Sequence, residues 1–289
     1  KDLNLEVKQG EIFGLLGPNG AGKSTFINIL GGSIFKTSGN VIVWGFDLDK
    51  NPRQVKASIG IVPQEVNIDP FFTPKQLLEL QAGLYGVKKK ERITDTILKL
   101  VSLETQAKSY SRSLSGGMKR RLLVAKALVH QPPIIILDEP TAGVDVELRK
   151  DMWKVVEGLR KTGVTIILTT HYIEEAEAIA DRVAVINQGE IIVVDNKIDL
   201  LKKMGHKKLT IELQDKVEKI PAELNEYNLS ISNDNYSLIY NYNLQAERTG
   251  ITKMLQDLKN AGLRMRDLKT EQNNLEKIFV TLVKENNED

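Results

Sequence analysis

A glycine-rich segment between an apolar run and a helical pattern constrains the fold of this chain more than any other feature. The segment begins with the spacing G-x-x-x-x-G-K-[ST], and its residues are Gly17, Pro18, Asn19, Gly20, Ala21, Gly22, Lys23, Ser24 and Thr25. The apolar run Ile12–Leu16 precedes it, and a helical pattern over residues 26–30 follows. A strand, a glycine turn and a helix in this order are typical of a loop that binds phosphate groups. We therefore expect an α/β fold with a ligand site at the end of this strand.

The chemistry of such a loop rests on its backbone and on two side chains. Glycines let successive N–H groups turn toward phosphate oxygens, and the helix that starts near Gly22 adds the positive end of its dipole. Lys23 is expected to reach the β- and γ-phosphates, and the Ser24 hydroxyl is expected to bind Mg²⁺. The alternative is a glycine-rich turn with a solvated lysine, which the flanking strand and helix disfavour. The segment thus predicts a site for a nucleoside triphosphate with Mg²⁺.

Two adjacent carboxylates follow a second apolar run. Residues 134–137 are all apolar and lead directly into Asp138 and Glu139. Ligands of open α/β sheets bind at the carboxyl ends of the strands, where this pair is expected to lie. We expect Asp138 to hold Mg²⁺ through water and Glu139 to orient and polarise the attacking water. A capped surface turn is the alternative, and the phosphate-type loop upstream makes it less favoured.

The pattern along the chain predicts two domains. Strand-like and helical segments alternate in the first, which indicates a largely parallel sheet covered on both faces. We expect this domain to span residues 1–205, with a first strand at Leu3, Leu5 and Val7 and a helical subdomain at about residues 65–117. Residues 206–289 are expected to form a small α+β accessory domain with a split βαββαβ sheet that ends in a helix over residues 275–284.

Composition excludes several classes of function. The formal net charge is only +2, so the chain lacks the basic field that nucleic-acid binding usually requires, and we expect no nucleic-acid partner. The absence of cysteine removes disulfides, thiolate metal sites and cysteine nucleophiles, and it fits an intracellular protein. No apolar run approaches the 18 or more residues of a membrane span.

Residues 114–120, Leu-Ser-Gly-Gly-Met-Lys-Arg, resemble the signature motif of ATP-binding cassette (ABC) proteins. Ser115, Gly116 and Gly117 precede a helix, so they would form a second anion-binding helix N-terminus with a free hydroxyl. A lone Ser-Gly-Gly is more often only a helix cap. In the family, the signature of one subunit closes over the ATP on the phosphate loop of another. The resemblance therefore implies a P-loop NTPase fold and a head-to-tail homodimer with two shared ATP sites.

Three further residues match this family. Gln64 corresponds to the glutamine that contacts Mg²⁺ and the attacking water and reports to a transmembrane partner. Asp145 corresponds to the aspartate that couples the two sites, and His171 to the switch histidine at the γ-phosphate. The resemblance thus implies Glu139, His171 and Gln64 as catalytic residues and Ser24, Gln64 and Asp138 as metal contacts. Each has an ordinary alternative: a surface amide for Gln64, a helix cap for Asp145 and a structural role for His171.

The amino-acid sequences of several motifs are similar to those in the ATPase subunits of drug-resistance, ABC-2-type exporters. This likeness covers residues 118–121, 139–145, 168–172 and 174–177, and extends to residues 275–282. It implies an ATP hydrolase that drives a separate transmembrane permease subunit from the cytoplasmic face of the inner or plasma membrane. In the family, an aromatic residue on a strand upstream of Leu3 stacks on adenine. We expect that segment to be absent here and assign no residue to adenine.

Two rival classes remain. A soluble cassette ATPase of DNA repair would carry a long coiled coil, and one of translation usually carries two cassettes in one chain. The short segment between Gln64 and Leu114 suits a compact helical insert instead. A small-molecule kinase would use residues 17–25 but would leave residues 114–118 without a role. The transported substrate belongs to the partner chain, and the resemblance favours export over import.

Overall fold

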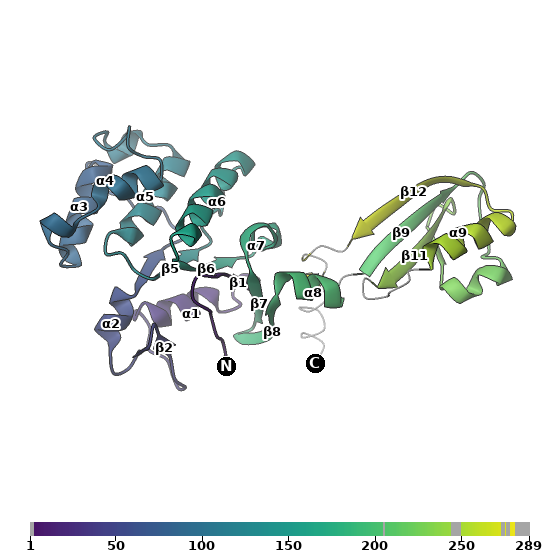
Figure 1. Ribbon diagram of the computed structural model, residues 1–289, viewed down its shortest axis with the longest axis horizontal. Helices are drawn as coiled ribbons and strands as arrows, with labels where there is room; N and C mark the ends of the chain where they lie inside the picture. The colour runs from purple at the N-terminus through teal and green to yellow at the C-terminus, as the bar shows by residue number, and fades with distance from the viewer. Residues whose placement is uncertain (1–2, 205, 244–249, 273–274, 276–277, 281–289) are drawn as a thin grey trace. The chain divides into compact units, whose positions relative to one another are not determined.

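The computed structural model describes residues 3–204, 206–243, 250–272, 275 and 278–280. The chain divides into two compact units, Lys1–Asp195 and Asn196–Asp289, each with its own sheet (Figure 1). With this division, helix α8 (Lys197–Met204) belongs to the second unit, whereas the boundary expected from the sequence follows it. Among the described residues, every helix is too short or too polar to span a membrane.

The first unit is built on a six-stranded sheet. Strands β4, β5, β6, β1 and β7 are adjacent in this order and parallel, and β8 completes the sheet beside β7. The strands are β1 (Ile12–Leu16), β4 (Ile59–Val62), β5 (Ile134–Asp138), β6 (Thr165–Thr170), β7 (Arg182–Asn187) and β8 (Glu190–Asn196). Gln188 and Gly189 join β7 to β8, both with positive φ, as in a two-residue hairpin turn. The predicted mainly parallel sheet is confirmed.

Both faces of this sheet are buried, which explains its continuous apolar runs. On one face, Ile135 and Leu137 pack in a cluster with residues of α5 and α6. On the other face, Ile134 and Ile136 pack in a cluster with residues of α1 and α2. Side chains alternate between the faces of a strand, so each face needs its own apolar set.

Helices cover the sheet and form the helical subdomain. The helices are α1 (Lys23–Leu30), α2 (Pro52–Ala57), α3 (Pro74–Leu84), α4 (Thr94–Leu100), α5 (Gly116–Leu128), α6 (Val146–Lys161) and α7 (Ile173–Ile179), with 3₁₀ turns η1 (Lys89–Glu91) and η2 (Ser111–Ser113). Helices α3, α4 and α5 gather at one side of this unit, away from α1 and α2 (Figure 1). The segment expected to be helical, residues 65–117, contains α3 and α4 and ends where α5 begins. Thr73 and Gln76 start α3 with a reciprocal capping box.

The strand expected at the N-terminus was predicted wrongly. Residues 3–8 have no strand structure, although Leu3, Leu5 and Val7 do pack against the core clusters. Every second side chain of this segment therefore packs on the core, but its backbone does not pair with a neighbouring strand. A short antiparallel hairpin of β2 (Ile42–Val43) and β3 (Phe46–Asp47) follows α1.

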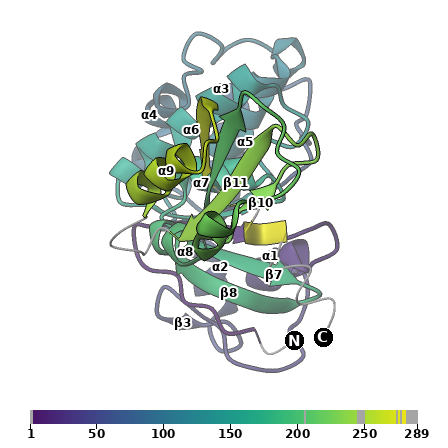
Figure 2. The same ribbon diagram turned by 90° about the vertical axis from the view of Figure 1, so that its right-hand side faces the viewer.

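The second unit contains a four-stranded antiparallel sheet. Its strands are β9 (His206–Leu213), β10 (Ser230–Ile231), β11 (Ser237–Asn243) and β12 (Met265–Gln272), in the order β10-β11-β9-β12. The 3₁₀ turn η3 (Ala222–Tyr227) and helix α9 (Ile251–Asn260) complete a split βαββαβ arrangement in which η3 replaces the first helix. Helix α9 lies beside the strands of this sheet (Figure 2). Its Met254 and Leu258 belong to one buried cluster with Ile211 and Leu238 of the sheet. Most of the helix expected over residues 275–284 lies outside the described residues.

His130, which belongs to no sequence motif, links the helical subdomain to the sheet. Its ring stacks on Tyr85, with centroids 3.8 Å apart, and its Nε2 lies 3.1 Å from the carbonyl oxygen of Ile59. Tyr85 ends α3 and Ile59 begins β4, so the imidazole contacts both parts. Burial lowers the pKa of His130, and the bond to Ile59 opposes this shift.

This lowered pKa predicts a pH-dependent stability. Below about pH 6.5 the unfolded chain protonates His130 more readily than the folded chain does, so the folded state loses stability as the pH falls. Urea unfolding midpoints measured between pH 7.5 and pH 5.5 should therefore fall more for the wild type than for His130→Gln. Equal slopes in the two proteins would show that the imidazole does not titrate in this way.

Candidate functional site

The glycine-rich loop runs from the end of β1 to the start of α1 and is shaped by its neighbours. A Cβ on Gly17 would lie 2.5 Å from the carbonyl oxygen of Ile186 on β7, so only glycine fits there. Gly20 and Gly22 have φ of 81° and 107°, conformations that glycine adopts without strain. The Gly189 N–H donates to the carbonyl oxygen of Ala21 at 2.9 Å. The edge hairpin of β7 and β8 therefore supports the loop from behind.

Lys23 lies at the centre of this loop. Its side chain is 5 % exposed, and its ammonium donates to the carbonyl oxygens of Gly17 at 2.7 Å and Pro18 at 3.1 Å. The Oε1 atom of Glu139 is 3.4 Å away. A buried ammonium with neutral carbonyl partners and one carboxylate is well placed to bind an anion that enters the loop.

Glu139 is the meeting point of the residues expected to be catalytic. Its carboxylate is almost fully buried, and its Oε1 lies 3.2 Å from His171 Nδ1 without the alignment of a hydrogen bond. The Gln64 Nε2 donates to Glu139 Oε2 at 3.1 Å. Gln64, Glu139, His171 and Lys23 follow the neighbouring strands β4, β5, β6 and β1, respectively. The carboxyl ends of these parallel strands thus bring the four side chains together.

The two adjacent carboxylates point to different partners. The Glu139 N–H donates to the carbonyl oxygen of Thr169 at 3.0 Å, and the Thr169 hydroxyl donates to Asp138 Oδ1 at 2.6 Å. Glu139 has φ of 43°, in the left-handed region that a non-glycine residue rarely adopts. This turn directs Glu139 toward Lys23 and leaves Asp138 at the strand end.

The oxygen donors near the loop fit a magnesium ion that is bound together with phosphates. Ser24 is exposed in the first turn of α1, Asp138 is partly exposed, and Gln64 donates its amide nitrogen to Glu139, which leaves its amide oxygen for a cation. Mg²⁺ usually binds through one or two carboxylates and substrate phosphates instead of a cage of protein ligands. In the described part of the chain, no group of three or more His, Cys, Asp or Glu side chains is arranged to hold a metal by itself.

Ser115, Gly116 and Gly117 begin α5, apart from the glycine-rich loop. The Met118 N–H donates to the Ser115 hydroxyl at 3.3 Å, so Ser115 caps the helix. A Cβ on Gly116 would meet no atom within 4 Å, whereas one on Gly117 would lie 2.6 Å from Leu148 Cδ2. No hydrogen bond among the described residues joins this segment to residues 17–25. Asp145 similarly caps α6, because its Oδ1 accepts from the Leu148 N–H at 2.9 Å.

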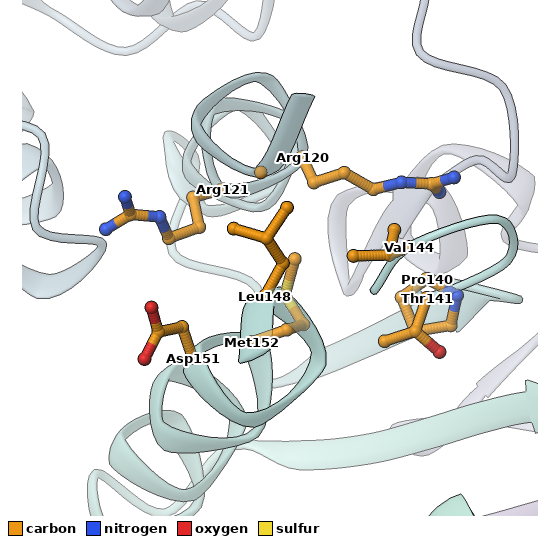
Figure 3. A pocket seen from close by; sticks show the side chains of 9 residues that line it. Arg120, Arg121, Pro140, Thr141, Val144, Leu148, Asp151 and Met152 are labelled. Carbon is orange, nitrogen blue, oxygen red and sulfur yellow. The ribbon is translucent and has the colours of Figure 1, made fainter. Parts of the chain in front are cut away.

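Arg120 contacts two loops of the site, a role that its place in the signature-like segment does not indicate. Its Nη1 donates to the Gln64 carbonyl oxygen and its Nη2 to that of Ala142, both at 2.8 Å. Burial lowers the pKa of this guanidinium. Arg120 extends from α5 over the loop that carries Thr141, and a cavity of about 10 Å³ lies below α5 (Figure 3). The only local sign of this contact is the position of Arg120 one turn after the glycines.

Comparison with known proteins identifies the family. The family model described as ABC transporter matches residues 1–142. The chain is 34% identical to the linearmycin resistance ATP-binding protein LnrL of Bacillus subtilis, over 98% of this chain and 92% of that protein. It is 39% identical to the Nod factor export ATP-binding protein I of Rhizobium etli, over 70% of this chain and 65% of that protein.

A solved structure shares the fold of the first unit. It is a dimeric ATP-binding cassette in a post-hydrolysis state bound to ADP and Pi, 29% identical, with a TM-score of 0.59 over 68% of this chain and 89% of that chain. The likeness to LnrL extends along nearly the whole of both chains. The chain therefore belongs to the ATP-binding proteins of ABC transporters and is an ATPase of that family.

Proposed function

We propose that two copies of this chain hydrolyse ATP at sites shared between them, and that hydrolysis drives export through a separate membrane subunit. The observation that carries this proposal is the buried Glu139 carboxylate, which contacts Lys23, His171 and Gln64 at once. A carboxylate that meets a phosphate-binding lysine and two polar side chains can orient a water molecule toward a terminal phosphate. The likeness to the Nod factor export ATP-binding protein I supports the direction of transport.

The residues of the chain have separate roles in this mechanism. The loop of residues 17–25 binds the phosphates, and the Lys23 ammonium exchanges its carbonyl partners for phosphate oxygens. Glu139 accepts a proton from the attacking water. His171 and Gln64 hold that carboxylate in position relative to the terminal phosphate. Glu139 contacts His171 and Gln64 before ATP binds, so these three side chains need little reorganisation during the reaction itself.

Ser24, Asp138 and Gln64 are the residues that would hold Mg²⁺ with the nucleotide. The ion would neutralise negative charge on the phosphates when bound. Thr169 orients Asp138 for this contact through its hydroxyl. A hard cation with few protein ligands agrees with the three oxygen donors that the chain supplies.

Replacing the proposed base should separate hydrolysis from binding. Glu139→Gln keeps the size of the side chain but cannot accept the proton, so steady-state hydrolysis should fall by about 10²-fold or more while ATP still binds. Lys23→Ala should instead weaken ATP binding about tenfold or more, because it removes a charge-assisted contact with phosphate. Titration calorimetry and a phosphate-release assay measure the two effects. Hydrolysis at the native rate by Glu139→Gln would refute the assignment of the base.

The second copy is expected to supply Ser115, Gly116 and Gly117. These residues begin a helix whose N-terminus is exposed, and Gly116 has open space around it within one chain. A helix N-terminus of this kind attracts anions. A dimer in which it faces the terminal phosphate of the other copy would fill that space, in line with the solved dimeric cassette.

A matched pair of glycine substitutions tests the shared site. Gly17→Ala should lower both the thermal midpoint and ATP affinity, because its Cβ meets a backbone carbonyl. Gly116→Ala should leave both unchanged but abolish the ATP-dependent dimer that sedimentation velocity detects in a Glu139→Gln background. Gly158→Ala, in α6 and without a close contact, is the control. A Gly116→Ala protein that still dimerises with ATP would contradict the shared site.

The membrane subunit is expected to dock in a groove beside Gln64. This groove has a volume of about 500 Å³ and is lined by Ile61, Pro63, Asn67, Ile68, Asp69, Leu77, Gln81, Tyr85, Leu122, Leu123, Lys126 and Ala127. Pro63 immediately precedes Gln64, whose amide contacts Glu139, so an occupant would touch the loop that reaches the site. We assign the groove to a helix of the membrane subunit with an apolar face, and this contact would hold the chain on the cytoplasmic face of the inner or plasma membrane.

A bulky side chain in this groove should uncouple the two subunits. Gln81→Trp fills the groove from α3 and should abolish the stimulation of ATPase activity by the membrane subunit in proteoliposomes. The basal rate of the isolated ATPase should stay within about twofold, since Gln81 lies on α3 and lines the groove instead of the phosphate-binding loop. Lys99→Trp, on an exposed face of α4, is the matched control and should retain stimulation. Normal stimulation of Gln81→Trp would exclude this groove as the docking site.

A further inference from the structure

A buried carboxylate to which the sequence motifs assign no catalytic or binding role joins the two loops that carry Glu139 and His171. Glu175 on α7 is 1% exposed. Its Oε1 accepts a hydrogen bond from the Thr141 hydroxyl, and its Oε2 accepts one from the Thr170 hydroxyl at 2.8 Å. The Nε atom of Arg149 lies 3.5 Å from Oε1 and supplies a positive charge. Both oxygens of this carboxylate are therefore used.

The two threonines stand directly beside the proposed catalytic residues. Thr141 is two residues after Glu139, and Thr170 immediately precedes His171. The Thr170 hydroxyl also accepts a hydrogen bond from the Tyr172 N–H at 2.9 Å, so both neighbours of His171 are fixed. The His171 ring in turn contacts the Tyr172 ring, with centroids 4.0 Å apart. One carboxylate thus ties the turn after β5 to the turn after β6.

The turn at Glu139 needs such support. Glu139 has a positive φ, and a non-glycine residue keeps this strained conformation only where its surroundings hold it. The Ala142 N–H donates to the Glu139 carbonyl oxygen at 3.1 Å, which closes the turn, and Thr141 lies between these two residues. A fully satisfied buried network fixes one geometry more strongly than separate hydrogen bonds would.

We propose that Glu175 is a positioning residue, which sets the separation of Glu139 and His171 by holding Thr141 and Thr170 together. This inference rests on the roles of Glu139 and His171 in the proposed function. Glu175 has no bond to the loop of residues 17–25 among its described contacts, so its action is on the chemical step and not on ATP binding. A displacement of the base by about 1 Å is sufficient to lower a rate by about 10²-fold.

The Thr141 hydroxyl provides the sharpest test. In the full-length protein, Thr141→Val removes the hydrogen bond to Glu175 and keeps the size of the side chain. Its kcat for ATP hydrolysis should fall by about tenfold or more, with KM within about twofold of the native value. Thr141→Ser restores the hydroxyl and should return kcat to within about twofold. Thr170→Val and Thr170→Ser should behave as a parallel pair.

The chain offers a matched control for a purely structural role. Thr94 is also buried, and its hydroxyl donates to Glu79, which pairs with Arg92 at 2.7 Å in the helical subdomain. Thr94→Val should lower the thermal midpoint about as much as Thr141→Val does but leave kcat unchanged. If Thr94→Val lowers kcat as much as Thr141→Val does, or if Thr141→Ser fails to restore kcat, Glu175 has only a structural role.

The Glu139→Gln variant in the same assay separates this inference from the proposed function. If Glu139→Gln is inactive while Thr141→Val and Thr170→Val keep the native kcat, the positioning role is refuted and the base assignment stands. If Glu139→Gln hydrolyses ATP at the native rate, the proposed function itself fails. Loss of kcat in Thr141→Val and Thr170→Val, with an unchanged KM and with kcat restored by the two serine variants, supports the positioning role.

Discussion

The common carboxyl edge of four adjacent parallel strands is the constraint on which the site depends. Parallel strands end at the same side of a sheet, so the residues after β4, β5, β6 and β1 meet there although they are far apart in sequence. The four residues are Gln64, Glu139, His171 and Lys23. Their contacts place charged and polar groups at the mouth of a sheet that is otherwise apolar on both faces. An ABC ATPase therefore needs the parallel order before any of its motifs can act.

The sequence was most informative where a pattern is local. The apolar runs of β1 and β5 have neighbours on both faces, and their ends, followed by Gly and by Asp-Glu, could be recognised without a structure. The same reasoning failed at Leu3, Leu5 and Val7, because alternation shows which side chains are buried but not whether the backbone has a pairing partner. A strand requires that partner.

The contacts of Arg120 and Glu175 could not have been predicted. Arg120 binds carbonyl oxygens of two loops, and Glu175 binds Thr141 on one of these loops and Thr170 at the end of β6. A carbonyl or a threonine has no distinctive sequence pattern, and a charged side chain on a helix is usually solvated. His130 is similar, since it follows α5 whereas its stacking partner Tyr85 caps the end of α3. Only the folded arrangement reveals that these polar side chains are partly or fully buried.

The hairpin of β7 and β8 has a consequence for how this protein can be divided. The Gly189 N–H in its turn donates to the carbonyl oxygen of Ala21, and the carbonyl oxygen of Ile186 lies against Gly17. The last two strands of the sheet therefore support the conformation of the phosphate loop. The ABC family model, by contrast, matches only as far as residue 142. A fragment that ends at residue 142 would lose these contacts of β7 and β8 with the phosphate loop. An autonomous nucleotide-binding fragment must extend at least through β8.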